Sequence, residues 1–373
     1  MYGQFFTKSH VLQNAVLQAI INTPKHCLEP CVGKGHLVQC VKSQYPDTEW
    51  TCIEYDSTLQ QYENVPKPIY SDFLQQIFDT TFDTIVANPP YIQRKGKQNI
   101  YIECIKKCFY LLQNKGQMIL ILPSEFIRGT NASKMIQLLD YHGSIYYIYH
   151  SKREDLFDNA SIDVLVLGYI KDSSYPKTIL YNDVQYPYTV RNGMFHIMTH
   201  KNEVCVQDYF KVYVGMVSGC DKIFKHSNGN IDILTGNNNE IQTKERFIYT
   251  ENFPTHDKII DDYLYSHKNT LLNRRICRFH ENNWWKWGAP RNKKKIEEFW
   301  GYPCIYVHTL SRQKTIAFEG TVQYFSGSLL MMIPHDTTIS LQKWVSTINT
   351  NRYQFDYSGR FRITHKQLTN AMF

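Results

Sequence analysis

The sequence lacks several features that would each place it in a familiar class. It has no uncharged apolar run approaching roughly 18 residues, so no membrane-spanning helix is expected. The first ten residues, MYGQFFTKSH, have no apolar signal-peptide core, so a cytoplasmic location is expected. The ten cysteines form no Cys-x-x-Cys pair and no set at zinc-ligand spacing. We therefore expect reduced, mostly buried thiols and no metal site.

Hydrophobic and aromatic residues, by contrast, are plentiful. They make up 43% and 14% of the 373 residues, which argues against disorder and supplies enough apolar surface for real cores. A chain of this length is long enough for two domains.

Charge is distributed unevenly along the chain. Residues 1–170 hold 15 Lys and Arg against 16 Asp and Glu, a balance of −1. The remaining residues hold 26 and 18, a balance of +8. A basic half joined to a neutral half indicates a polyanion as partner of the second half, although a solvated surface with surplus lysine would give the same count.

Strand and helix patterns alternate over the first half of the chain. Strands are predicted at 26–29, 50–54, 69–70, 82–87, 117–122, 144–150 and 162–170, and helices at 11–20, 37–41, 101–112 and 133–141. This alternation predicts a doubly wound α/β sheet. After about residue 171 short aromatic strands, glycines and asparagines replace the alternation, so we predict domains at 1–172 and 178–373.

Polar residues end three consecutive predicted strands. The stretch EPCVGKG runs from Glu29 to Gly35, and glycines such as Gly33 let the backbone approach a ligand closely. Glu54 closes the next strand, where an acidic residue commonly binds ribose hydroxyls. Asp72 and Phe73 follow the third strand and suit an adenine amine and an adenine ring. These ends converge on one sheet edge and predict an adenosine-containing ligand.

The fourth strand ends in IVANPPY, in which Asn88, Pro89, Pro90 and Tyr91 follow an apolar run. The exocyclic amine of a nucleobase is a poor nucleophile because its lone pair is delocalised. Two acceptors, the Asn88 carboxamide oxygen and the Pro89 carbonyl, would favour a more tetrahedral nitrogen, and Tyr91 offers a stacking face. A rigid turn with a buried tyrosine is the alternative structural interpretation.

These motifs, in this order, resemble the N6-adenine DNA methyltransferases of the gamma class, of the TaqI-like type. The segment from Gly3 to Thr7 is similar to the family's N-terminal FxTP-like segment, but Lys8 stands where proline is usual. The resemblance implies a Rossmann-like S-adenosylmethionine-dependent methyltransferase domain and a C-terminal mixed α+β target-recognition domain. It also implies that a set of residues surrounds S-adenosyl-L-methionine: Thr7, Glu29, Cys31, Glu54, Tyr55, Asp72, Phe73, Asn88 and Pro90.

The same family places a second aromatic ring on the far face of a flipped base. The matching stretch of this chain begins at Asp155, which makes Phe157 the expected partner of Tyr91. A core phenylalanine beside a strand is the structural alternative. Flipping a base out of the duplex costs a few kcal/mol, which two rings and two hydrogen bonds can offset.

The second half resembles the family's recognition domains more loosely, at 212–224, 303–309 and 325–333. Cations interleave with tryptophans between 274 and 295, a pattern typical of phosphate and base contacts, although a Trp-rich core beside a basic helix would also produce it. The residues expected to contact DNA are Arg94, Lys95, Lys97, Arg274, Arg275, Arg278, Lys286, Arg291, Lys293 and Lys294.

The sequence therefore predicts a monomeric, site-specific DNA methyltransferase that modifies adenine N6 in double-stranded DNA, with a separate restriction endonuclease as an expected partner. Three alternatives stay open. N4-cytosine methylation poses the same chemical problem, but SPPY is the more usual motif there. RNA or protein-glutamine methylation also uses NPPY-like motifs, and a non-catalytic DNA-binding relative would be expected to have damaged cofactor residues.

Overall fold

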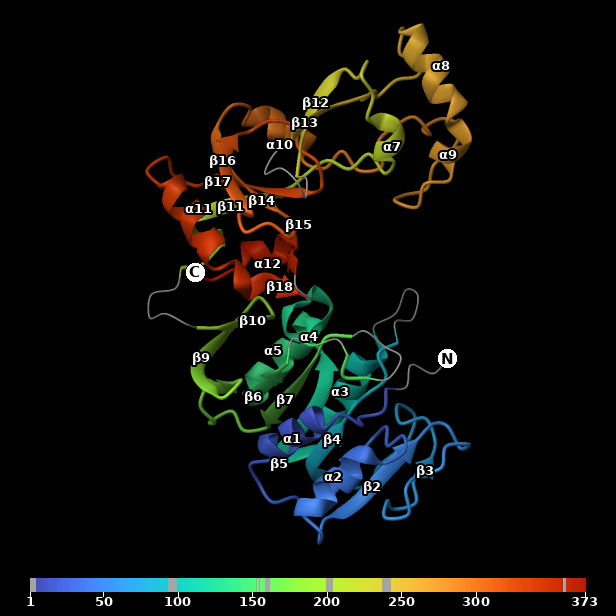
Figure 1. Ribbon diagram of the computed structural model, residues 1–373, viewed down its shortest axis with the longest axis vertical. Coiled ribbons are helices and arrows are strands. Elements are labelled where there is room, and N and C mark those ends of the chain that lie inside the picture. Colours follow the sequence, from blue (N-terminus) through green and yellow to red (C-terminus); the bar gives the residue numbers. More distant parts are fainter. Residues whose placement is uncertain are drawn as a thin grey trace. The chain divides into compact units, whose positions relative to one another are not determined.

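The computed structural model describes residues 5–92, 99–151, 153, 155–157, 162–198, 204–236, 243–357 and 360–373. The chain divides into two compact units, Met1–Glu203 and Val204–Phe373 (Figure 1). Each unit has cores of its own. Within the described ranges, no helix is both long and apolar enough to cross a membrane.

The first unit is built on a ten-stranded sheet in the order β10-β9-β8-β6-β7-β5-β4-β1-β2-β3. Its first seven strands are β1 His26–Glu29, β2 Glu49–Glu54, β3 Ile69–Tyr70, β4 Phe82–Ala87, β5 Leu112–Pro123, β6 Ser144–His150 and β7 Val164–Ile170. Strands β3, β2, β1, β4 and β5 are parallel, and β7 is inserted antiparallel between β5 and β6. The unit is thus a Rossmann-like α/β domain, as predicted.

Helices cover both faces of this sheet: α1 His10–Ala19 and α2 His36–Gln44 one face, and α3 Ile100–Leu111 and α5 Ser133–His142 the other (Figure 1). Neighbouring residues of β4 face opposite ways, because strand side chains alternate. Ile85 packs in the cluster that contains α3, and Val86 packs in the cluster that contains α1. Burial on both faces explains why β4 reads as a continuous apolar run.

The first unit extends further along the chain than the sequence predicts. Strands β8 Thr178–Tyr181, β9 Val184–Arg191 and β10 Met194–Ile197 continue the sheet beyond β6, and β8 pairs with β6 in parallel. Ile179 is fully buried in the same cluster as β4. The predicted boundary between 172 and 178 is therefore wrong, and these strands belong to the first unit.

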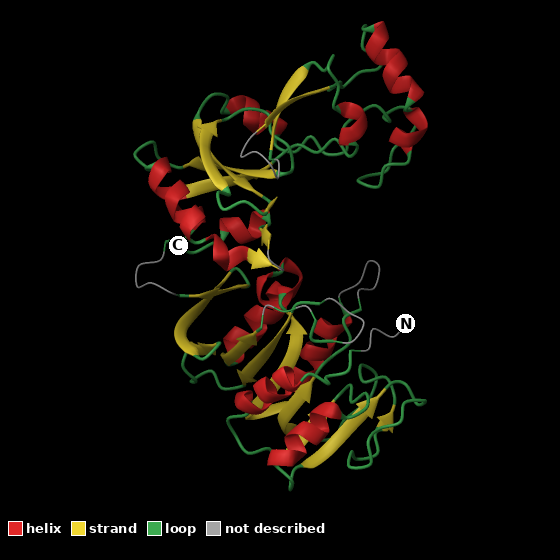
Figure 2. Ribbon diagram, in the orientation of Figure 1, coloured by secondary structure: helices red, strands yellow, loops and turns green. Residues whose placement is uncertain are grey.

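The second unit mixes small antiparallel sheets with short helices, in agreement with the predicted α+β character (Figure 2). Its four-stranded sheet has the order β11-β17-β14-β16. Trp344 packs edge-on against Phe210 of that sheet, with 5.0 Å between ring centroids. The strands are β11 Phe210–Val214, β12 Ile231–Thr235, β13 Thr243–Phe247, β14 Pro303–His308, β15 Leu310–Ser311, β16 Ala317–Thr321, β17 Leu329–Pro334, β18 Asp356–Tyr357 and β19 Arg360–Arg362. The helices are α6 Val206–Tyr209, α7 Asp221–Phe224, α8 Lys258–Ser266, α9 Lys268–Leu272, α10 Lys293–Glu298, α11 Leu341–Thr350 and α12 His365–Thr369.

Candidate active site

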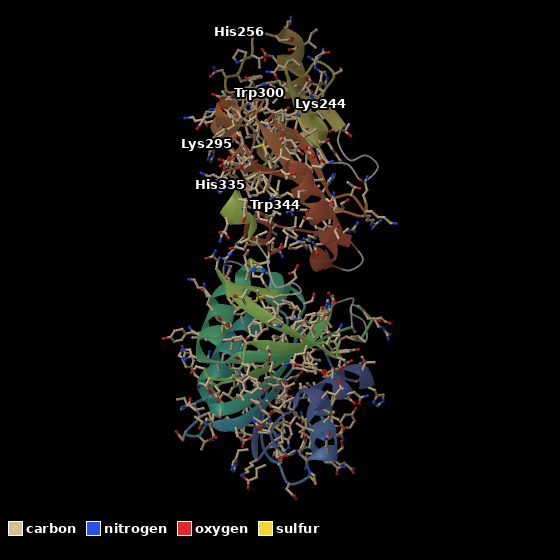
Figure 3. The ribbon with its side chains drawn as sticks, turned by 90° about the vertical axis from the view of Figure 1, so that its left-hand side faces the viewer. Lys244, His256, Lys295, Trp300, His335 and Trp344 are labelled. Atoms are coloured by element: carbon tan, nitrogen blue, oxygen red, sulfur yellow. The ribbon has the colours of Figure 1, made fainter. Side chains whose placement is uncertain are left out.

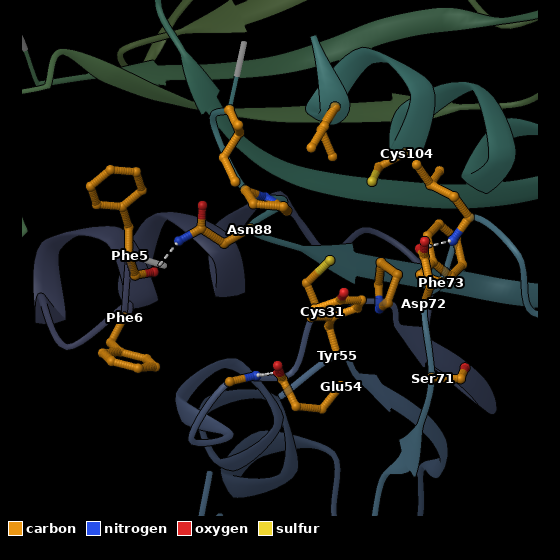
Figure 4. A pocket seen from close by; sticks show the side chains of 16 residues that line it. Phe5, Phe6, Cys31, Glu54, Tyr55, Ser71, Asp72, Phe73, Asn88 and Cys104 are labelled. Atoms are coloured by element: carbon orange, nitrogen blue, oxygen red, sulfur yellow. Dashed lines mark hydrogen bonds between the residues drawn. The ribbon is translucent and has the colours of Figure 1, made fainter. Parts of the chain in front are cut away.

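A cavity of about 360 Å³ lies at the carboxyl ends of the central parallel strands of the first unit (Figure 4). Strand β1 is flanked by β2 on one side and β4 on the other, and such a switch point is where open α/β sheets bind ligands. The lining residues are Phe5, Phe6, Pro30, Cys31, Gly33, Glu54, Tyr55, Ser71, Asp72, Phe73, Leu74, Asn88, Pro90, Ile92, Ile100 and Cys104. The predicted polar strand ends thus meet at one site.

The loop between β1 and α2 needs its glycines. Gly33 and Gly35 have φ angles of 54° and 91°, and a Cβ on Gly35 would lie 2.3 Å from Val65 Cγ2. The Gly33 amide donates to Glu54 Oε2 at 2.7 Å, and the Asp56 amide donates to Glu54 Oε1 at 2.9 Å. The carboxylate at the end of β2 therefore holds the loop that follows β1.

Three more predicted residues lie in the same cavity. Asp72 Oδ1 accepts from the amide of Leu74 at 2.9 Å, while the adjacent ring of Phe73 is only 4% exposed. Tyr55 also lines the cavity and is 65% exposed. A carboxylate has about four acceptor sites, so Glu54 and Asp72 keep capacity for a ligand beyond these amide contacts. This acidic and aromatic lining fits an adenosine group.

Glu29 is buried beneath the loop, and its Oε1 accepts from the amide of Cys31 at 3.2 Å. Burial is the main cause that raises the pKa of Glu29 well above its ordinary value. A hydrogen bond with Cys104 and burial raise the pKa of the Cys31 thiol. Both groups therefore favour their neutral forms in this protein without a ligand.

The buried Glu29 carboxyl predicts a pH dependence of stability. Its pKa is raised in the folded protein, so the unfolded chain loses this proton at lower pH, near about 4.3. The stabilisation that the protonated Glu29 carboxyl provides is fully present below that pH. It declines as pH rises through the raised pKa of Glu29 in the folded protein. At higher pH, each pKa unit by which folding raises the pKa of Glu29 lowers the free energy of unfolding by about 1.4 kcal/mol. Glu29→Gln removes this cost, so its unfolding temperature should increasingly exceed the wild type's as pH rises above about 4.3.

Thermal unfolding of the protein without cofactor checks this prediction. Glu63→Gln removes an exposed carboxyl of the same unit and serves as the matched control. A difference between Glu29→Gln and wild type that stays constant across the pH range would show that the buried carboxyl has no raised pKa.

Asn88 stands immediately after β4, and its side chain is held at both ends. Its Nδ2 donates to the carbonyl oxygen of Phe5 at 2.8 Å and to Thr7 Oγ1 at 3.0 Å. The Tyr91 hydroxyl lies 2.7 Å from Asn88 Oδ1 and 3.0 Å from the carbonyl oxygen of Ile121. Thr7, which the resemblance places at the cofactor, is thus found positioning Asn88 with its hydroxyl.

The two rings expected to sandwich a base both contact a third ring. Phe5 stacks on Tyr91 with centroids 5.3 Å apart and an interplanar angle of 25°. Phe157, which is 5% exposed, also contacts Phe5, with its centroid 5.5 Å from that of Phe5. Burial raises the pKa of the Tyr91 hydroxyl, which therefore stays protonated as a donor.

The structure removes Arg274 from the set of residues expected to contact DNA. Its guanidinium is 8% exposed and donates to four carbonyl oxygens, those of Leu271, Ser218, Trp284 and Lys286. Its guanidinium carbon also lies 3.6 Å from the centroid of the Phe279 ring. A charge pattern cannot distinguish a buried organising arginine from a surface one, which is why the prediction for Arg274 was wrong.

The other expected DNA contacts are placed as follows. Arg94, Lys95 and Lys97 lie outside the described residues. Lys293 is half-buried and pairs with Glu297 at 2.7 Å, and such a surface pair contributes little to stability. The exposed members are Arg275, Arg278, Lys286, Arg291 and Lys294.

The tryptophans of the same stretch divide between core and surface. Trp284 and Trp287 are buried, so the structural alternative holds for these two. Lys295 and Trp300, near α10, both project outward (Figure 3).

Sequence reasoning missed several residues of the site. Phe5 and Phe6 line the cavity, although they belong to the segment singled out for its resemblance. Their aromatic character was the available signal. Outside the cavity lining, a buried network of the first unit was also missed, in which Asp163 accepts from Ser124 Oγ at 2.6 Å and contacts His150 Nε2 at 2.7 Å. Only the fold brings these three residues together.

Comparison with known proteins found similarity to restriction-modification methyltransferases. The sequence model of the Eco57I restriction-modification methylase family matches residues 36–157. The type II methyltransferase M.HincII of Haemophilus influenzae is 28% identical over 190 residues, which are 45% of this chain and 37% of that protein. M.CvrRI of Paramecium bursaria Chlorella virus XZ-6E is 26% identical over 152 residues, or 37% and 40% of the two chains.

Among solved structures, a type I restriction-modification methyltransferase subunit from Streptococcus thermophilus superimposes with a TM-score of 0.40 and 16% identity, covering 54% of this chain and 51% of that one. The chain spans well under half the length of the two curated relatives. The family match covers α2, β4 and the NPPY stretch and ends at Phe157. Residues 36–157 of this chain are therefore similar to the Eco57I restriction-modification methylases.

Proposed function

We propose that this protein transfers a methyl group to the N6 amine of an adenine flipped out of double-stranded DNA. The observation that carries the proposal is the placement of Asn88 at the end of β4, lining the same cavity as Glu54 and Asp72. Methylation of a conjugated amine requires an amide acceptor beside a site that can hold the adenosine group of the methyl donor.

The expected cofactor is S-adenosyl-L-methionine, which when bound supplies an electrophilic methyl group on a sulfonium sulfur. Glu54 is suited to hold the ribose hydroxyls, and Asp72 and Phe73 are suited to hold the adenine. The glycine loop allows close approach of the backbone, and the carboxyl of Glu29 lies buried beneath that loop. The acidic and aromatic lining described above supports these assignments.

Asn88 and Pro89 act on the target amine. The Asn88 carboxamide oxygen accepts one N–H, and the Pro89 carbonyl accepts the other, which draws the nitrogen lone pair away from the ring and toward the methyl group. As the new C–N bond forms, the bond between the methyl carbon and the sulfonium sulfur would break and leave its electron pair on sulfur, and the amine would lose one proton to solvent. Phe5 and Thr7 fix the amide orientation, so the acceptor oxygen is directed before substrate arrives. Holding the two reactants in line removes much of the entropic barrier.

The second unit supplies the DNA contacts in this proposal. Its surplus of cations suits the phosphate backbone, and the exposed arginines and lysines between 275 and 294 are the proposed contacts. Methylation would then serve restriction–modification, with a separate endonuclease as partner and the methylase acting as a monomer.

The decisive experiment is to incubate the protein with a random-sequence duplex pool and methyl-labelled cofactor, then map the modified atom and its flanking sequence. Label on adenine N6 within a common sequence supports the proposal. Label on cytosine N4 would replace it with the cytosine alternative. Label on RNA or on a glutamine peptide supplied in parallel, with none on DNA, would overturn it.

A further inference from the structure

The ring of Phe5 contacts both of the rings that the proposed function assigns to the flipped base. Phe5 stacks on Tyr91, with 5.3 Å between centroids, and lies 5.5 Å from Phe157. Its carbonyl oxygen is fastened to Asn88 Nδ2 at 2.8 Å. The rings of Phe5 and Phe6 project to opposite sides of the backbone, and Phe5 lies beside Asn88 (Figure 4).

This arrangement leaves no room for a base between Phe5 and Tyr91. Atoms in contact lie about 3.5 Å apart, so two rings that sandwich a base must be separated by about 7 Å. The observed separation of 5.3 Å corresponds to two rings packed directly on each other.

Other parts of the protein also contact Tyr91. Tyr101 approaches its ring edge-on at 6.1 Å, and the Tyr91 hydroxyl faces the carbonyl oxygen of Ile121 at 3.0 Å. The Phe5 side is the one next to the cavity, because Phe5 and Asn88 both line it. A base that reaches Tyr91 from the cavity must therefore displace the Phe5 ring.

We infer that Phe5 is a specificity-determining residue whose ring fills the base site and competes with the target base for Tyr91. This inference rests on the proposed function. A phenyl ring can stack but has no amine to donate to Asn88 or Pro89. A base with a correctly placed exocyclic amine gains those hydrogen bonds and therefore displaces the Phe5 ring from Tyr91. A base without one gains only stacking, which Phe5 already provides, so it stays excluded.

Two substitutions with opposite expected effects test the inference. Phe5→Ala removes the competitor, so affinity for a duplex carrying the target adenine should rise about three- to tenfold, the range that one aromatic pair contributes. Phe5→Trp enlarges the competing ring, so affinity for the same duplex should fall. Dissociation constants of the full chain are measured by fluorescence anisotropy, with the recognition sequence taken from the methylation mapping. Thermal unfolding verifies that both variants are folded.

A duplex with an abasic target position provides the matched control, because it offers no base to compete with Phe5. Both variants should bind it as wild type does. Loss of adenine affinity in Phe5→Ala would overturn the inference and make Phe5 a wall that packs on the base. Equal changes on both duplexes, or no change on either, would overturn it as well. If the wild-type protein methylates DNA but the two variants do not show the expected changes in affinity, only the inference about Phe5 fails. If the wild-type protein does not methylate DNA, the proposed function itself fails.

Discussion

Replacing Asn88 by alanine is expected to lower the rate of methyl transfer to DNA by at least about 100-fold, the cost of losing one preorganised hydrogen-bonding group at a reacting atom. The side chain is the only part removed, and its oxygen is the proposed acceptor for the target amine. Initial rates with labelled cofactor measure the effect. Binding of the cofactor product, measured by calorimetry, should persist, because Glu54 and Asp72 still line the cavity.

The Asn88→Ala variant also loses the hydrogen bonds from Asn88 to Phe5 and Thr7, so it must be shown to be folded. Three lost hydrogen bonds, the third being that from the Tyr91 hydroxyl, cost roughly 2–4 kcal/mol in total, which thermal unfolding will register. Asn64→Ala changes an exposed asparagine of the same unit and is the matched control, with unchanged rate and stability expected. A rate within a few-fold of wild type for Asn88→Ala would refute the role given to this residue.

Replacing Arg274 by alanine is expected to destabilise the second unit by about 3–5 kcal/mol, comparable to breaking a buried ionic contact. Four carbonyl oxygens would lose their donor, and the ring of Phe279 would lose the guanidinium packed on it. Burial lowers the pKa of Arg274 to about 10, which leaves it charged at neutral pH. Chemical denaturation of the full chain measures the loss.

The neighbouring Arg275 offers an unusually close control, because it is exposed and differs by one position. Arg275→Ala should change the free energy of unfolding by less than about 0.5 kcal/mol. If Arg275 contacts phosphate, the same substitution should weaken DNA binding and reduce its salt dependence by about one counterion. Equal stability of the two variants would contradict the organising role of Arg274.

The strands of the first unit could be predicted because each carries a local signal. The strand at 144–150 begins and ends where the sequence predicts, since an apolar run is bounded by a glycine and a polar segment. Asn88 and Glu54 were likewise identified from their places at strand ends. Parallel strands direct such ends to one edge, so position along the chain already implies position in space.

Properties that depend on which side chains meet were not predictable in this way. Arg274 and Arg275 are adjacent and chemically identical, yet only the first is buried. The ring of Phe5 meets Tyr91 across more than 80 residues of sequence, and no periodic pattern announces that contact. The strands of 178–197 were assigned to the wrong domain because their partner is β6, which lies across a connection that reads like a linker.

That assignment matters to anyone who wishes to prepare the methylase domain as a separate fragment. A truncation after residue 172 would strip β8 from β6 and leave an unpaired backbone edge. It would also uncover the apolar surface that Ile179 and Tyr188 now shield. Such an edge invites pairing with other copies, so the shortened fragment should precipitate. A fragment that extends through Ile197 retains β8, β9 and β10 and therefore keeps the native edge of its sheet.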